Sequence, residues 1–138
     1  MRRLEFVVPG TPVPWQRAAT HGKQRYNPAS MRRAKEAIRV AWLADGGHRL
    51  PSGCAVGLSA LFFRCRKPEA VPDLSNYLKL VEDALIGLAY DDDCVITDFD
   101  RVRKRRARCA AEERTEIVLW DVRHRLTVGG SGNFASSR

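Results

Sequence analysis

The residues with the clearest chemical potential are the acids of one segment, PDLSNYLKLVEDALIGLAYDDD, at positions 72–93. Residues 73–100 carry eight of the chain's 16 Asp and Glu residues, and Lys79 is the only base among them. Carboxylate oxygens are the ligands that hard cations such as Mg²⁺ prefer, and a nearby lysine can stabilise developing negative charge. The acids from Asp73 to Asp93, with Lys79 between them, therefore predict a divalent-metal site.

The rest of the chain is strongly basic, with 24 Lys and Arg residues and a net charge of +8. Lys and Arg bind phosphate with a gain from counterion release, so this charge favours a nucleic-acid partner over the alternative that it serves solubility alone. Trp15 and Tyr26 border a basic loop and are suited to stack on bases. The predicted DNA contacts are Arg17, Lys23, Arg25, Arg101, Arg103, Lys104 and Arg105.

Metal-binding acid inside a positive field is the chemistry of a nuclease, because the metal activates water while basic flanks hold the phosphodiester backbone. Each acid also has a purely structural explanation. Asp73 or Ser75 is placed to cap a helix, residues 91–93 suit a polar turn, and Glu82 and Asp83 suit a helix surface, with Glu82 able to pair with Lys79.

Length and composition bound the class of protein. With 138 residues, of which 44% are hydrophobic and 29% charged, the chain fits one globular domain. We expect a soluble, cytoplasmic protein without a membrane contact, because no segment has the length of a signal-peptide core or of a membrane span. The four cysteines lack metal-site spacing, so we expect them to be reduced and mostly buried or half-buried in strands, without structural zinc.

Hydrophobic periodicity predicts the element order β-α-β-α-β-β, an α/β fold of the α+β type with a mixed sheet. Residues 1–125 form the predicted domain, and the Gly/Ser-rich residues 126–138 a flexible tail. The strand at 54–65 is apolar at nearly every position, which predicts a central strand covered on both faces. The other predicted strands are 4–8, 94–105 and 115–122, and the predicted helices are 28–45 and 75–88.

The acidic segment also resembles a known family. The stretches DLSNYLK at 73–79, DAL at 83–85 and YDDDCVI at 90–96 are similar to the RusA family of Holliday junction resolvases, small endonucleases common in prophages. VPGTPVPWQR and GKQRYNP, near the start of the chain, resemble the opening of that family, so the resemblance spans roughly residues 5–122.

This resemblance implies a RusA-like homodimer that binds branched DNA and resolves four-way junctions by paired, metal-dependent nicks, in DNA recombination and repair. It implies Mg²⁺ as the cofactor, with Mn²⁺ as a substitute. Residue by residue, Asp73 matches the first catalytic and metal-binding aspartate and Lys79 the catalytic lysine. Asp93 matches the later catalytic and metal-binding aspartate, with Asp92 beside it as a further ligand. Asp73 precedes the predicted helix and residues 91–93 follow it, so the length of the helix separates these acids within one chain. Dimerisation would supply part of the arrangement that brings acids together.

One position departs from the family pattern of Asp-x-Asp-Asn, because Ser75 stands where the second aspartate is usual. Three outcomes follow: Ser75 itself binds the metal, Asp91 or Asp92 supplies the missing charge, or the protein binds junctions without cutting them. We expect an active enzyme with weaker metal affinity or a shifted metal preference. The alternatives are a non-catalytic branched-DNA-binding protein and an RNA-binding, translation-associated protein.

Overall fold

The computed structural model of the protein describes residues 3–17, 28–51 and 53–123. In chain order the elements are β1 (Arg3–Pro9), α1 (Pro28–Ala44), β2 (Val56–Arg64), α2 (Leu74–Leu85), β3 (Ile96–Arg106) and β4 (Arg114–Asp121). Short 3₁₀ turns precede α2 (Pro68–Ala70), β3 (Asp93–Val95) and β4 (Ala110–Glu112). The predicted order β-α-β-α-β-β is therefore confirmed.

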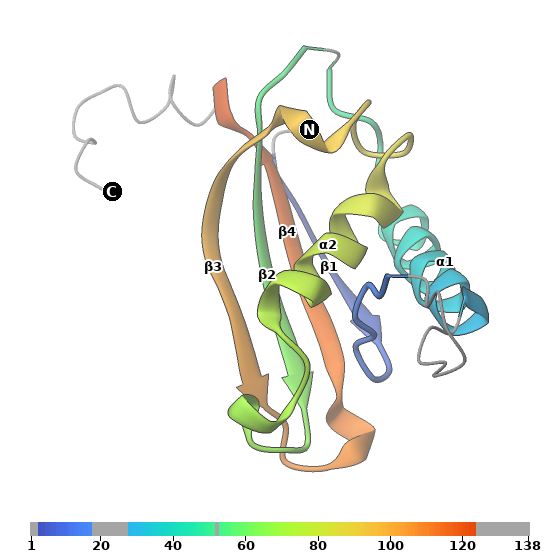
Figure 1. Ribbon diagram of the computed structural model, residues 1–138. Helices are drawn as coiled ribbons and strands as arrows, with labels where there is room; N and C mark the ends of the chain where they lie inside the picture. Colours follow the sequence, from blue (N-terminus) through green and yellow to red (C-terminus); the bar gives the residue numbers. More distant parts are fainter. Residues whose placement is uncertain (1–2, 18–27, 52, 124–138) are drawn as a thin grey trace.

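The strands form one mixed four-stranded sheet in the order β1-β4-β2-β3. β4 pairs antiparallel with both β1 and β2, whereas β2 and β3 run parallel and are connected through α2. Both helices pack on the same face of the sheet, so the described residues form a two-layer α+β domain (Figure 1). β3 lies at one edge of the sheet, beside the helix that carries the acidic segment.

The core lies between the sheet and the two helices because each element directs its apolar stripe there. Alternate residues of β2, from Val56 to Phe62, are buried, and they meet Trp42 of α1 and Tyr77 of α2. The Phe62 and Tyr77 rings stack with their centroids 5.1 Å apart. This packing fixes the orientation of α2, and with it the direction in which the polar face of α2 points.

A bulge interrupts β3 near its middle. Leu58 pairs with Phe99 and Ala60 with Val102, so Asp100 and Arg101 together lie opposite Ser59 alone. Arg101 adopts a positive φ of 61°, which is uncommon for a residue with a Cβ, and its carbonyl accepts a hydrogen bond of 3.1 Å from the Ser59 hydroxyl. Beyond the bulge, Ala60 and Phe62 on the helix side pair with Val102 and Lys104, while Leu61 and Phe63 on the other face pair with Arg103 and Arg105.

Three sequence expectations need correction. The second helix ends at Leu85 and not at 88, because Gly87 has a φ of 86° and Ile86 forms a bridge with Tyr90. The strand predicted from 94 begins at Ile96, after a 3₁₀ turn. β2 is interior but not covered on both faces: within the part of the chain described, the helices lie on one face only, and Leu61 and Phe63 on the other are half-buried.

The cysteines also differ from expectation. All four are free, but Cys94 and Cys109 are exposed, and none lies within a strand. The predicted tail at 126–138 lies outside the described residues. In the described ranges, no helix combines the length and the apolar character needed to cross a membrane.

Candidate active site

The amino-terminal part of α2 presents three of the predicted site residues on its outer side. Asp73 occupies the N-cap position, Ser75 lies in the first turn and Lys79 one turn later, and all three side chains are exposed. The Asp73 carboxylate makes no capping hydrogen bond, and the Asp73 backbone carbonyl instead accepts the Asn76 and Tyr77 N–H groups. The prediction that Asp73 caps the helix is therefore confirmed for its position, but its side chain makes no capping hydrogen bond, which leaves the carboxylate available to a ligand.

Lys79 is held against an aromatic ring from another part of the chain. Its ammonium nitrogen lies 4.9 Å from the ring centroid of Trp15, within the range of a cation–π interaction. The Trp15 backbone N–H donates a 2.9 Å hydrogen bond to the Asn76 carbonyl, so the loop after β1 is joined directly to α2. Residues far apart in the sequence are thus brought together at this end of the helix.

A half-buried ion pair anchors the same loop at its other end. The Glu113 side chain, only 9% exposed, accepts hydrogen bonds from the Thr11 hydroxyl at 2.5 Å and the Cys65 N–H at 2.7 Å, and pairs with Arg64 at 3.4 Å. Arg64 in turn donates to the Tyr77 hydroxyl at 2.9 Å. The Cys65 N–H, followed by the Thr11 hydroxyl, holds the pKa of Glu113 below its usual value.

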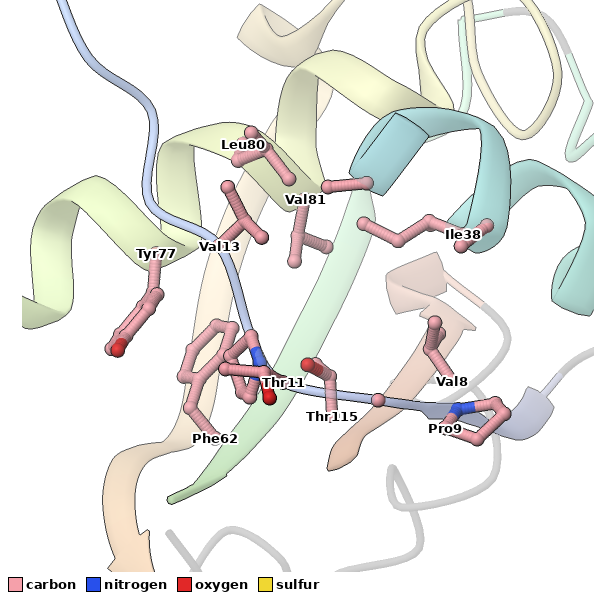
Figure 2. Close-up of a pocket in the computed structure, with 14 residues that line it drawn as sticks. Val8, Pro9, Thr11, Val13, Ile38, Phe62, Tyr77, Leu80, Val81 and Thr115 are labelled. Carbon is pink, nitrogen blue, oxygen red and sulfur yellow. The ribbon is translucent and has the colours of Figure 1, made fainter. Parts of the chain in front are cut away.

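The pocket between this loop and the helices is apolar. It is lined by Val8, Val13, Ile38, Phe62, Leu80 and neighbouring residues, and none of its lining residues is acidic (Figure 2). The candidate chemistry therefore lies on the exposed side of α2 and not in this pocket.

A second cation reaches the start of α2 from β3. The Lys104 ammonium donates a hydrogen bond of 3.3 Å to the carbonyl of Pro72, the residue before Asp73. Lys104 is half-buried on the helix side of the sheet, unlike Arg103 and Arg105, which are exposed on the opposite face. The predicted basic strand is therefore divided: Lys104 points to the start of α2, whereas Arg103 and Arg105 point away from it.

The remaining predicted acids gather around the carboxyl end of α2. Burial raises the pKa of Glu82, and Asp93 and Asp83 raise it further through charge repulsion. The buried Tyr90 ring holds the segment between α2 and β3 in place, since its hydroxyl donates to the Glu82 carbonyl at 2.8 Å. Asp92 is exposed, Asp93 half-buried and Glu82 half-buried, so Glu82 is not the plain surface charge that the sequence favoured.

Asp73 and the Asp93 group occupy opposite ends of one helix. The rise of about 1.5 Å per residue separates Asp73 from Glu82 by about 13 Å along the helix axis. Figure 1 shows the segments before and after α2 at opposite ends of the sheet. Among the described residues, no group of three or more His, Cys, Asp or Glu side chains is arranged to hold a metal ion. Metal binding by Asp73, Ser75, Asp92 and Asp93 stays a prediction.

Asp91 has a different environment from its two neighbours. Its carboxylate forms an ion pair with Arg49, and Arg49 also donates to the Gly87 carbonyl at 2.8 Å. The side chain of Asp91 is thus used to hold the loop after α2. Of the two acids considered as substitutes for the missing aspartate, only Asp92 keeps a position beside Asp93 without this ion pair.

The predicted DNA contacts are spread over the surface. Arg17 is exposed two residues after Trp15, and Arg101, Arg103 and Arg105 are exposed along β3. Lys23 and Arg25 lie outside the described residues. Sequence reasoning assigned Trp15 to base stacking and did not find its contact with Lys79; the only signal was its position in the loop that resembles the family's opening.

Fold and site together define a small α+β protein with an exposed carboxylate at the start of one helix, an exposed lysine on that helix and a basic edge strand. A family model described as Endodeoxyribonuclease RusA matches residues 9–119, and the chain belongs to this family. The RusA family is a family of nucleases that act as Holliday junction resolvases and bind branched DNA. A comparison with curated protein sequences found no match.

Proposed function

We propose that the protein is a metal-dependent endodeoxyribonuclease that resolves four-way DNA junctions as a homodimer, in recombination and repair. The observation that carries this proposal is the state of Asp73. Its exposed carboxylate stands at a helix start without a capping hydrogen bond, with Ser75 in the same turn and Lys79 one turn further along. A carboxylate that accepts no hydrogen bond from its own helix has its oxygen atoms available to a ligand.

The residues present fit Mg²⁺. Asp73, Ser75, Asp92 and Asp93 offer only oxygen atoms, the donor type that Mg²⁺ takes, and Mn²⁺ accepts the same set. Asp73 and Ser75 would hold the ion from the helix, and Asp92 and Asp93 from the segment before β3. When bound, the ion supplies charge stabilisation and an activated water for phosphodiester hydrolysis.

The chain's own residues then bind and orient the DNA. Lys79 places a positive charge on the exposed side of α2, one turn after Ser75, where it would stabilise the negative charge that develops on the phosphate oxygens. Lys104 brings a second positive charge to the backbone just before Asp73. Arg17, Arg103 and Arg105 are exposed and would hold the phosphates of the junction arms, contacts that fix position without reading sequence.

The homodimer resolves the separation of the two acidic groups. Within one chain, Asp73 and Asp93 belong to opposite ends of α2, so a twofold axis crossing the helices would bring Asp93 of the partner subunit to Asp73. Each composite site would then contain acids from both protomers. Two such sites related by twofold symmetry suit the two symmetry-related strands of a four-way junction.

Junction cleavage tests the activity. The purified protein is expected to nick a synthetic four-way junction in Mg²⁺ or Mn²⁺ and to stop when the metal is chelated. Asp73→Asn and Asp93→Asn should each abolish cleavage and leave junction binding intact. Asp91→Asn is the matched control, because the Asp91 carboxylate is paired with Arg49, and it should keep its activity. Full cleavage by Asp73→Asn would exclude the proposed site.

Mixed dimers test the composite site. Two differently tagged chains, one carrying Asp73→Asn and the other Asp93→Asn, are coexpressed and the heterodimer is purified. If each site combines the two protomers, one site of the heterodimer regains both acids, and single nicks return. If each site lies within one chain, every site still lacks one acid and the heterodimer stays inactive.

Ser75 supports one alternative, a protein that binds branched DNA without cutting it. Replacing the usual carboxylate by a hydroxyl removes a negative charge from the ligand set, which weakens the hold on a divalent cation. Ser75→Asp decides between the two. A wild type that is silent in every metal, together with a cutting Ser75→Asp variant, would establish the binding-only function.

A further inference from the structure

We infer that Trp15 is a positioning residue for Lys79, and that its indole face holds the lysine ammonium in one place on the exposed side of α2, the helix that begins after Asp73. The inference rests on the proposed function, because it assigns Trp15 a part in the same site. It differs from the sequence expectation that Trp15 stacks on DNA bases. The argument depends on the lysine, on the ring and on the loop that carries the ring.

Lys79 needs an external support. It lies on the exposed side of α2, and a lysine has four rotatable side-chain bonds, so an exposed ammonium samples many positions. The Trp15 ring lies against it, with the ring centroid 4.9 Å from the ammonium nitrogen. Tryptophan is the best aromatic partner for a cation, and an exposed pair of this kind favours the contact roughly two- to five-fold.

The ring is itself held in position. Trp15 is half-buried and packs against the hydrophobic core, and its backbone N–H donates a hydrogen bond of 2.9 Å to the Asn76 carbonyl. Because Asn76 precedes Lys79 by a single helical turn, the backbone of α2 holds both the Trp15 residue and the lysine. The contact therefore has a fixed geometry that does not depend on the rest of the loop.

The loop is also anchored at its beginning. The Gly10 N–H donates to the Glu113 carbonyl at 3.1 Å, and the Thr11 hydroxyl donates to the Glu113 carboxylate at 2.5 Å. Attachment at both ends leaves little freedom to the residues between. Trp15 thus presents a preorganised surface to Lys79, and preorganisation is what an electrostatic group needs in order to act on a transition state.

The lysine ammonium lies over one face of the Trp15 indole. Trp15 could act by stacking on DNA bases or by positioning Lys79, and these two roles predict different kinetic effects. A stacking residue contributes to DNA affinity, whereas a positioning residue contributes to the rate once DNA is bound. The rate of junction cleavage under single-turnover conditions at saturating protein, compared with the binding affinity, distinguishes them.

The test uses the full-length protein and a four-way junction in Mg²⁺. Trp15→Leu should lower the saturated cleavage rate about two- to five-fold and leave junction affinity unchanged. Trp15→Phe, which keeps an aromatic face, should retain most of the rate. Gln16→Ala, at the exposed neighbouring position, is the control and should match the wild type. Thermal unfolding of each variant shows whether it folds.

A double-mutant cycle links the effect to the lysine. In a Lys79→Met background, Trp15→Leu should cause no further loss of rate. An equal loss in both backgrounds, or a loss confined to DNA affinity, would overturn the inference and support base stacking.

A measurement independent of cleavage separates this inference from the proposed function. Reductive ¹³C-methylation labels the lysines, and the Lys79 resonance is identified by its disappearance in Lys79→Arg. Its position over the ring predicts an upfield ring-current shift that vanishes in Trp15→Leu. A Lys79 signal at the ordinary position overturns the positioning role even if the protein cuts junctions. The expected shift in a protein that cuts nothing would refute the proposed function alone.

Discussion

Substituting Glu113 by glutamine should destabilise the protein more than any other single loss of charge among the ion pairs described here. The Glu113 carboxylate joins three parts of the fold: the loop after β1 through Thr11, the end of β2 through Arg64 and the Cys65 N–H, and the start of β4. Through Arg64, it also reaches Tyr77 of α2. Glutamine keeps the shape and one carbonyl oxygen but removes the charge.

The size of the expected loss in stability follows from the low exposure of the Glu113 and Arg64 side chains. The Glu113 and Arg64 side chains are only 9% and 17% exposed, so removing the acid leaves a poorly solvated guanidinium without its counter-charge. Breaking such a pair costs about 3–5 kcal/mol when it is fully buried. Because Arg64 keeps some exposure and its bond to Tyr77, we expect a loss of about 3 kcal/mol in the free energy of unfolding, at the lower end of that range.

The effect should also depend on pH, in a direction set by the pKa of Glu113. Hydrogen bonds from Cys65 and Thr11 lower this pKa below its ordinary value of 4.5 in the folded protein. An acid with a lowered folded-state pKa stabilises the fold fully above its unfolded pKa, and the stabilisation disappears as the pH falls through the folded pKa. The difference between wild type and Glu113→Gln should therefore be largest at neutral pH and shrink under acid conditions.

Urea unfolding followed by circular dichroism, at neutral pH and at the lowest pH where the wild type folds, measures both quantities. Glu116→Gln is the matched control, because Glu116 also pairs with an arginine, Arg114 at 2.7 Å, but its side chain is 36% exposed. That pair should contribute less than about 1 kcal/mol. Equal losses in the two variants, or a Glu113→Gln loss that ignores pH, would refute the reasoning.

Two further predictions concern β3 and its neighbours. The double substitution Arg103→Ala and Arg105→Ala should reduce the salt slope of junction binding, measured by fluorescence anisotropy, by about 1.8, whereas Lys104→Ala, whose ammonium is bonded to a carbonyl, should change the slope less. Equal slopes would remove the two arginines from the interface. Gly57→Ala should lower the free energy of unfolding in urea by about 1–3 kcal/mol, because its Cβ would lie 2.0 Å from the Trp120 ring, and an unchanged value would contradict this packing.

Hydrophobic periodicity was sufficient to predict the order of the elements, since it reports directly which residues face a core. It failed at the end of α2. Leu85 and Leu88 keep helical spacing, but Gly87 adopts a positive φ and Ile86 pairs with Tyr90, so the chain leaves the helix while the apolar pattern continues. Such an end depends on a contact formed only in the folded protein.

The candidate site, too, was predictable from the sequence only in part. The sequence located Asp73 at a helix start, because position alone identifies an N-cap, but it did not indicate whether the side chain would make the capping bond. The contact between Trp15 and Lys79 joins two segments separated by α1 and β2. No local pattern records a pairing at that distance along the chain, so only the folded structure could provide it.

The bulge at Arg101 determines to which face of the sheet each of the following basic residues of β3 points. In an extended strand successive side chains alternate between faces, so removing one residue at the bulge would exchange the two sets. Arg103 and Arg105 would then turn under the helices, and Lys104 would turn to solvent, away from the Pro72 carbonyl that it now contacts. The bulge therefore determines which face of the sheet each cation occupies: Lys104 faces the helix that begins after Asp73, and Arg103 and Arg105 face the outer surface.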